Sequence, residues 1–122
     1  MEFTGICIVT DKVVELTNFY KKLLAVDADG DENHTDLRTN GAAISIFSKE
    51  GMDGLAPGSM DSSGIGNITL NFRVENVDKE YERVSALGVE FIKLPTTHPW
   101  GARSFWFRDP DGNIVNFFGI LR

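Results

Sequence analysis

The sequence predicts an α+β protein in which one strand–helix–strands unit occurs twice. A β-hairpin near the C-terminus is the first support: Ser104–Phe107 and Ile114–Phe118 are rich in aromatic and β-branched residues and flank Asp109-Pro-Asp-Gly-Asn113. Pro, Gly, Asp and Asn favour a tight turn between two such strands. An internal repeat and a Gly-rich polar stretch between the two halves are the other supports.

The repeat is visible as two aligned pairs of segments. Thr4–Val9 aligns with Thr69–Val74, and residues 41–47 align with residues 112–118, with a glycine opening both. A strand–helix–strands unit repeated with matched glycines indicates a duplication. We therefore expect one domain over residues 1–122, with module one at about 3–50, a linker at about 51–65 and module two at about 66–122.

The first half begins with an apolar run of strand length, Thr4–Val9, followed by a helix. Apolar residues of the helix recur at three- and four-residue spacing, as on one helical face: Val13, Leu16, Phe19, Tyr20, Leu23 and Leu24. Ala25–Asp36 is acidic and polar and is expected to be a solvated turn. Ala42–Phe47 is expected to be a strand, and Ser48–Ile65 has the glycine, proline and serine content of a linker.

The second half repeats the pattern. Ile68–Val74 alternates apolar and polar residues as a half-buried strand does. Val77, Tyr81, Val84 and Leu87 mark a helical face that Gly88 ends. Val89–Leu94 is expected to be a strand and Pro95–Gly101 a loop that leads into the hairpin.

Composition limits the possible partners. The chain has 122 residues, a net charge of −6 and one cysteine. An acidic protein is poorly suited to nucleic acid or an anionic membrane surface. Cys7 is expected to be an inert core thiol, and a single cysteine cannot form an internal disulfide. We expect a cytoplasmic protein, with neither a signal peptide nor a membrane span.

A longer motif surrounds the hairpin turn. Pro99 to Asn113 reads P-W-G-x-R-x-F-x-F-x-D-P-D-G-N, and this run resembles the C-terminal part of the vicinal oxygen chelate superfamily, the glyoxalase, bleomycin-resistance and extradiol dioxygenase group. The resemblance covers Thr4 to Leu121. It implies two tandem βαβββ modules that form an incomplete barrel around a cleft, and a homodimer that covers the exposed sheet edges.

Metal-dependent members of this superfamily place His, Gln or Glu ligands on the first and last strands of each module. The positions that correspond here are Thr4, or Gly5 if the register differs by one, with Thr69, Ser45 and Asn116. None supplies a carboxylate or an imidazole, the ligands that Zn, Ni, Mn or Fe would need. The sequence therefore predicts that the chain uses no metal and no other cofactor.

The residues expected to line the cleft are aromatic or neutral and polar. The strand period of two places Asn71 and Arg73 with Thr69, Phe118 with Asn116, and Phe47 with Ser45. His98 and Trp100 would lie at the mouth, and Arg73 or Arg103 would receive a carboxylate. Trp106 is expected to lie in the core or in an interface. The predicted ligand-binding residues are Thr4, Ser45, Phe47, Thr69, Asn71, Arg73, His98, Trp100, Arg103, Asn116 and Phe118.

These residues favour metal-independent binding of a small organic molecule, similar to the antibiotic-sequestering branch of the superfamily. The alternative is an enzyme, either a glyoxalase-like isomerase or lyase or a dioxygenase relative with a displaced metal site. A third interpretation is a structural protein with a collapsed cleft. The sequence assigns no catalytic residue: His98 is the one candidate for proton transfer, and no second group lies at a matching spacing.

Overall fold

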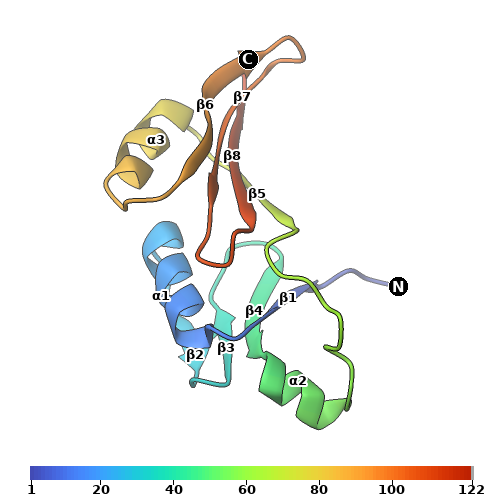
Figure 1. The fold of residues 1–122 in the computed structure, drawn as a ribbon. Coiled ribbons are helices and arrows are strands. Elements are labelled where there is room, and N and C mark those ends of the chain that lie inside the picture. The colour runs from blue at the N-terminus through green and yellow to red at the C-terminus, as the bar shows by residue number, and fades with distance from the viewer. Residues whose placement is uncertain (122) are drawn as a thin grey trace. The chain divides into compact units, whose positions relative to one another are not determined.

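A computed structural model describes residues 1–121 of the chain. These residues form two compact units that divide between Ile65 and Gly66, drawn from blue to green and from yellow to red in Figure 1. Each unit contains one four-stranded sheet, and the described residues form no closed barrel. None of the helices within 1–121 has the length and apolar character that crossing a bilayer requires.

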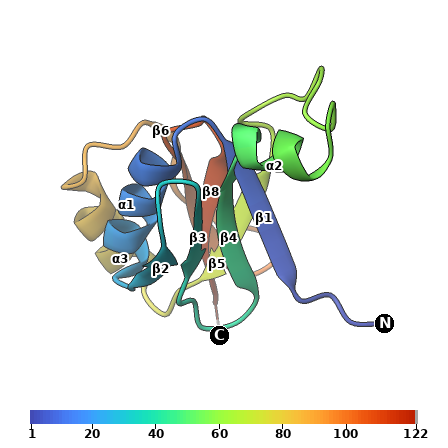
Figure 2. The same ribbon diagram turned by 90° about the horizontal axis from the view of Figure 1, so that it is seen from below.

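The first unit has the connectivity βαβββ followed by a short helix. Its elements are β1 (Gly5–Thr10), α1 (Val13–Leu24), β2 (Ala28–Gly30), β3 (His34–Leu37), β4 (Ala43–Ser48) and α2 (Lys49–Leu55). The strand order is β1-β4-β3-β2, with β1 parallel to β4 and the other pairs antiparallel. Figure 2 shows α1 along one side of this sheet.

The helix α1 forms as its apolar spacing predicts. Leu16, Tyr20 and Leu23 are completely buried, and the helix packs against β3 and β4. Thr17 on α1 and Thr35 on β3 share a buried hydrogen bond of 2.8 Å, which satisfies two hydroxyls inside the core. The face of the sheet opposite α1 carries Cys7 and Ser45, which are register partners.

The second unit repeats the same topology. Its elements are β5 (Thr69–Arg73), α3 (Val77–Ser85), β6 (Phe91–His98), β7 (Ala102–Arg108) and β8 (Ile114–Ile120). The strand order is β5-β8-β7-β6, with β5 parallel to β8. In both sheets, the spatial order of the strands is therefore first, fourth, third and second along the chain. The predicted α+β fold of two βαβββ modules is confirmed.

An aromatic core holds α3 against this sheet. Phe105 and Phe107 are completely buried, and the ring of Phe105 lies 5.5 Å from Tyr81 on α3 and 5.6 Å from Phe117 on β8. Burying each such side chain contributes about 1.5–3 kcal/mol. The alternation of β7 and β8 thus sends Phe105, Phe107 and Phe117 to the helix side, and Trp106, Asn116 and Phe118 to the opposite face.

Strand β6 is longer than expected: it runs through Pro95 to His98, where the sequence predicted a loop over 95–101. The pairing with β7 shifts register between Phe91 and Lys93 and again between Lys93 and Thr96. Because β6 is an edge strand and Pro95 lies in an irregular stretch, the missing N–H of proline removes no regular ladder hydrogen bond. The prediction of a loop was wrong because proline is tolerated at such a bulge.

Three short elements were missed in the first unit. Residues 25–36 were expected to be a solvated acidic turn, but they contain β2 and the start of β3. Only Thr35 and Leu37 of β3 are buried, so the strand has little apolar signal. The expected linker 51–65 contains most of α2, which Ser48 caps by accepting a 2.8 Å hydrogen bond from the Gly51 N–H. No residue of α2 is buried, so no apolar periodicity marks it.

The register of β1 corrects the predicted alignment by one residue. Cys7 lies opposite Ser45, and Asn71 lies opposite Asn116. Since Ser45 and Asn116 are equivalent in the repeat, Gly5 rather than Thr4 is equivalent to Thr69. Thr4 precedes β1 and is exposed.

Cys7 is also exposed, so the prediction of a core thiol was wrong. The side chain lies on the face opposite α1, whereas Ile8 on the helix side is buried. Desolvation raises the pKa of the Cys7 thiol. A hydrogen bond with Ser45 lowers this pKa by a smaller amount, and the negative charge of Asp36 raises it slightly.

Asp109 organises the hairpin turn between β7 and β8. Its Oδ1 accepts hydrogen bonds of 2.9 Å from the N–H groups of Asp111 and Asn113, and Oδ2 accepts one of 2.9 Å from the Asn113 amide. Asp109 is 5% and Asn113 3% exposed. Gly112, at φ 89°, provides the left-handed residue that this turn requires.

Asp109→Ala should destabilise the protein by about 2–4 kcal/mol, because it leaves buried N–H donors without their charged acceptor. Chemical denaturation measures the change in the free energy of unfolding. Glu82→Ala, which removes the same charge from an exposed position on α3, is the control and should change stability little. Equal effects of the two substitutions would contradict the proposed role of the turn.

Candidate functional site

The face of the second sheet opposite α3 carries two rows of side chains in register. Asn71, Asn116 and Trp106 lie side by side across β5, β8 and β7, and Lys93 on β6 continues this row. The neighbouring row consists of Arg73, Phe118 and Ser104. The sequence predicted that Asn71, Arg73, Asn116 and Phe118 lie on one face of the sheet, and the strand register in the structure places them so.

A pocket of about 390 Å³ lies on this face. Its lining residues come from β6, β7, β8 and the turn between β6 and β7: Lys93, His98, Trp100, Ala102, Ser104, Trp106, Asn116 and Phe118. Aromatic and apolar side chains form most of the walls. Among the lining residues, Lys93 is the only one with a permanent charge.

Lys93 is the centre of a polar cluster in this pocket. Its Nζ lies 2.7 Å from Nε2 of His98 and donates a short hydrogen bond to Oγ of Ser104. The Ser104 hydroxyl lies 3.4 Å from the same His98 nitrogen. The ammonium also lies 4.9 Å from the centre of the Trp106 ring, a cation–π distance.

The environment of Lys93 is poor in compensating charge. Among the described residues, no carboxylate forms an ion pair with its ammonium. Partial burial lowers the pKa of Lys93, since desolvation disfavours the charged form. The hydrogen bond from an ammonium to His98 requires a neutral imidazole that accepts at Nε2.

Trp100 lies at the edge of the pocket, in the turn that joins β6 and β7. The Gly101 N–H bonds the His98 carbonyl at 3.1 Å and closes this turn. The Trp100 side chain is 75% exposed, and its ring stacks on the His98 ring at 4.4 Å with an interplanar angle of 3°. An indole this exposed contributes little to the core and offers one ring face to an incoming molecule.

Asn116 lines the pocket next to Trp106. Its amide donates a 3.0 Å hydrogen bond to Oδ1 of Asn71. The Asn116 Oδ1 and the Trp106 Nε1 are buried without a hydrogen-bond partner among the described residues. Unpaired buried groups cost about 1–3 kcal/mol each, so this face is less stable than a fully satisfied one.

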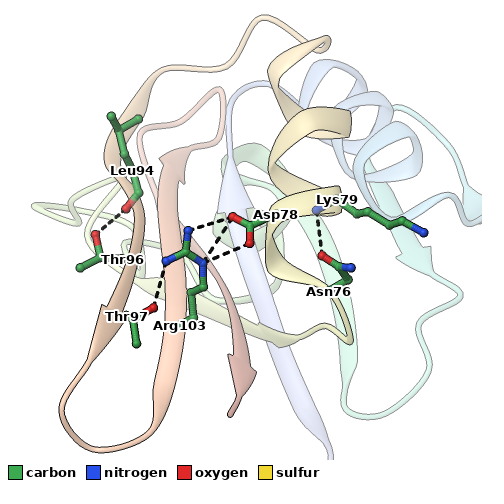
Figure 3. Close-up of polar contacts among 7 residues, drawn as sticks. All are labelled: Asn76, Asp78, Lys79, Leu94, Thr96, Thr97 and Arg103. Atoms are coloured by element: carbon green, nitrogen blue, oxygen red, sulfur yellow. Dashed lines mark hydrogen bonds and ion pairs between the residues drawn. The ribbon is translucent and has the colours of Figure 1, made fainter.

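Arg103 does not lie on this face. Its guanidinium donates to the Asp78 carboxylate on α3, with Nη2 at 2.9 Å from Oδ1, and Nη1 donates to Thr97 Oγ1 at 3.0 Å. Figure 3 shows Arg103 between β6 and α3, with both partners in place. The residue therefore ties the edge strand to the helix, and the prediction that it faces the ligand-binding cleft was wrong.

The remaining predicted residues lie outside the pocket lining. Thr69 and Arg73 share the face with Asn71 but lie at the two ends of β5, and Arg73 lines a separate hollow of about 860 Å³ with Leu121. Thr4, Ser45 and Phe47 belong to the first unit. In that unit Phe47 lies opposite His34, with the two rings 5.3 Å apart.

Lys93, Ala102 and Ser104 were missed by the sequence reasoning, and Trp106 was expected in the core or an interface. Alternation from Trp106 along β7 would have placed Ser104 and Ala102 beside it. Lys93 gave no such signal, because the register shift between Phe91 and Lys93 sends Phe91 to the core and Lys93 to the pocket.

Comparison with known proteins agrees with the topology. A sequence model of the Glyoxalase/Bleomycin resistance protein/Dioxygenase superfamily matches residues 3–117. The chain belongs to this superfamily. It is 30% identical over 128 residues to the uncharacterized protein YraH of Bacillus subtilis (strain 168), and the match covers 99% of this chain and 100% of that protein.

Two solved members of the superfamily share the fold at low sequence identity. One is a glyoxalase/bleomycin resistance protein/dioxygenase family enzyme from Burkholderia phytofirmans PsJN, with a TM-score of 0.86, 20% identity and coverage of 99% of this chain and 100% of that one. The other is a glyoxalase/bleomycin resistance protein/dioxygenase from Nocardioides, with a TM-score of 0.80, 23% identity and coverage of 100% and 85%.

The residues at the superfamily's metal-ligand positions do not fit a metal ion. Gly5 has no side chain, and a Cβ atom there would overlap the carbonyl oxygen of Ala43 on the paired strand. Ser45 and Thr69 offer neutral hydroxyls, and Asn116 offers a neutral amide oxygen, so none of the three supplies the charge or the imidazole that such a metal favours. Residues 1–121 contain no group of three His, Cys, Asp or Glu side chains that could hold a metal.

The lowered pKa of Lys93 is measurable. In a side-chain NMR titration, Lys93 should lose its proton at a lower pH than a lysine of the unfolded chain. Because its pKa is lower in the folded state than the ~10.4 of an unfolded lysine, folding stability should rise as the pH increases between these two values. A Lys93 titration midpoint at or above that of an unfolded lysine would contradict the desolvated environment.

Proposed function

We propose that this chain binds a small organic molecule with an aromatic or planar apolar part, and that it does so without a metal ion. The observation that carries the proposal is the pocket on β6, β7 and β8, whose walls are aromatic and whose polar groups converge from three strands. Concave, mostly apolar sites with a few placed polar groups are the usual form of small-molecule pockets.

The contacts of Trp100 and Phe118 support an aromatic ligand. Trp100 keeps one ring face against His98 and is otherwise largely exposed. Phe118 lies between Arg73 and Ser104 on the pocket face. A planar molecule in the pocket would stack against these rings, and each aromatic contact adds about 0.5–1.5 kcal/mol beyond burial. Asn116 and Lys93 would fix its polar end.

A second candidate function, a glyoxalase-like isomerase or lyase, is favoured by the cluster of Lys93, His98 and Ser104. A neutral imidazole next to a pocket is a common general base. The His98 Nε2 atom, however, already accepts from Lys93 at 2.7 Å. Proton abstraction from a substrate would require this hydrogen bond to break, whereas ligand binding does not. The binding function therefore needs fewer changes in the site.

The first test concerns the metal. Elemental analysis of protein purified without chelator should find Zn, Ni, Mn and Fe far below one ion per chain, because Gly5, Ser45, Thr69 and Asn116 provide no charged ligand. Ligand binding should also persist in excess chelator. A stoichiometric metal whose removal abolishes binding would contradict the metal-independent function.

The second test concerns Trp100. Trp100→Ala should weaken binding of the aromatic probe naphthalene-2-carboxamide by more than about tenfold, since it removes a stacking surface. The melting temperature should change little, because the indole is largely exposed. Calorimetric titration and thermal unfolding measure the two quantities.

Leu55→Ala, at an apolar residue of α2 that is 78% exposed, is the matched control and should alter neither affinity nor stability. A Trp100→Ala protein that is unfolded, or that is folded and binds the probe as tightly as the unchanged chain, would place the site elsewhere.

A further inference from the structure

We infer that the ligand of this pocket is an organic anion, an aromatic or planar acid whose anionic group is bound by the ammonium of Lys93. The inference rests on the proposed small-molecule function and adds the charge of the ligand and the residue that selects it.

Lys93 is a cation without a counter-ion in a mostly apolar pocket. Its hydrogen-bond partners, His98 and Ser104, are neutral acceptors. Among the lining residues no Asp or Glu is present, and within residues 1–121 its ammonium makes no ion pair. The chain as a whole has a net charge of −6, so acidic residues are plentiful but lie outside this pocket.

The ammonium still has capacity for a ligand. An ammonium has three N–H donors, and the two hydrogen bonds to His98 and Ser104 occupy two of them. These bonds hold Nζ in place, so little side-chain entropy is lost when a third acceptor binds. An anionic acceptor would replace solvent at the remaining donor and supply the missing charge, which makes it the best partner for this position.

Aromatic walls also bind cations, and this alternative fits the pocket less well. The ring face of Trp106 is already occupied by Lys93, with Nζ 4.9 Å from the ring centre. A ligand cation near this ring would lie next to the Lys93 charge without a carboxylate to separate them. The same ammonium that attracts an acid therefore excludes an amine of the same shape.

Three naphthalene probes that differ only in the substituent at position 2 test the inference: the carboxylate, the carboxamide and the aminomethyl cation. Calorimetry at neutral pH should show the carboxylate binding at least about tenfold more tightly than the carboxamide, the difference expected for one charge-assisted hydrogen bond. The cation should bind most weakly.

Lys93→Met keeps most of the apolar stem and removes the charge. It should abolish the preference, so that this variant binds the carboxylate and the carboxamide with equal affinity. Lys79→Met, at an exposed residue of α3, removes the same charge elsewhere and should preserve the preference. Lys93→Arg, which retains a cation, should retain part of it and guards against a Lys93→Met protein that fails to fold.

The outcomes separate the two proposals. If the carboxylate and carboxamide bind the unchanged chain equally, or if Lys93→Met retains the preference, the anion inference is wrong and the binding function stands. If none of the three probes binds, the proposed aromatic pocket is wrong, and the anion inference fails with it.

Discussion

The site of the second unit depends on two register shifts in β6. His98 lies five positions after Lys93 (98 − 93 = 5), an odd offset, so regular alternation would place the two side chains on opposite faces of the sheet. The shifts on either side of Lys93 bring both side chains to the face opposite α3, where the ammonium and the imidazole are 2.7 Å apart. A β-bulge re-aims side chains in this way at a low cost, because the edge strand has one free side. Without these shifts the pocket would lack its only permanent charge.

The two faces of the sheet in the second unit differ in function: one forms the core with α3, and the other carries the pocket. Phe105, Phe107 and Phe117 fill the helix side with interlocking rings, and Arg103 ties β6 and β7 to α3 through Asp78. The opposite face contributes less to the core and carries desolvated or unpaired groups, including Lys93 and the Trp106 N–H. Stability supplied by the aromatic side offsets the cost of polar groups held in a poorly hydrated pocket.

How much could be predicted from the sequence depended on how local each signal was. The hairpin was predictable because Asp109 to Asn113 contain the turn chemistry within five residues, and the repeat was predictable because β4 and β8 keep matched glycines before them. Strands β2 and β3 were missed because only Thr35 and Leu37 point inwards. Arg103 was misplaced because it lies two positions from Phe105 on β7 and therefore points to the same side of the sheet, towards the core. Lys93 was missed because a bulge in β6 interrupts the regular alternation of side chains.

The duplicated units also differ in how far their chemistry could change by substitution alone. Asn71 and Asn116 of the second unit correspond in register to Cys7 and Ser45 of the first, so the topology fixes equivalent positions while leaving the side chains free. At Gly5 this freedom ends, because β1 approaches β4 so closely that any Cβ would overlap the backbone of Ala43. Substituting Thr69 or Asn116 could add a metal ligand to the second unit. In the first unit, Gly5 is equivalent to Thr69, and a side chain at Gly5 would require β1 and β4 to move apart. The backbone of the first sheet, and not only its sequence, therefore prevents a side-chain ligand at Gly5.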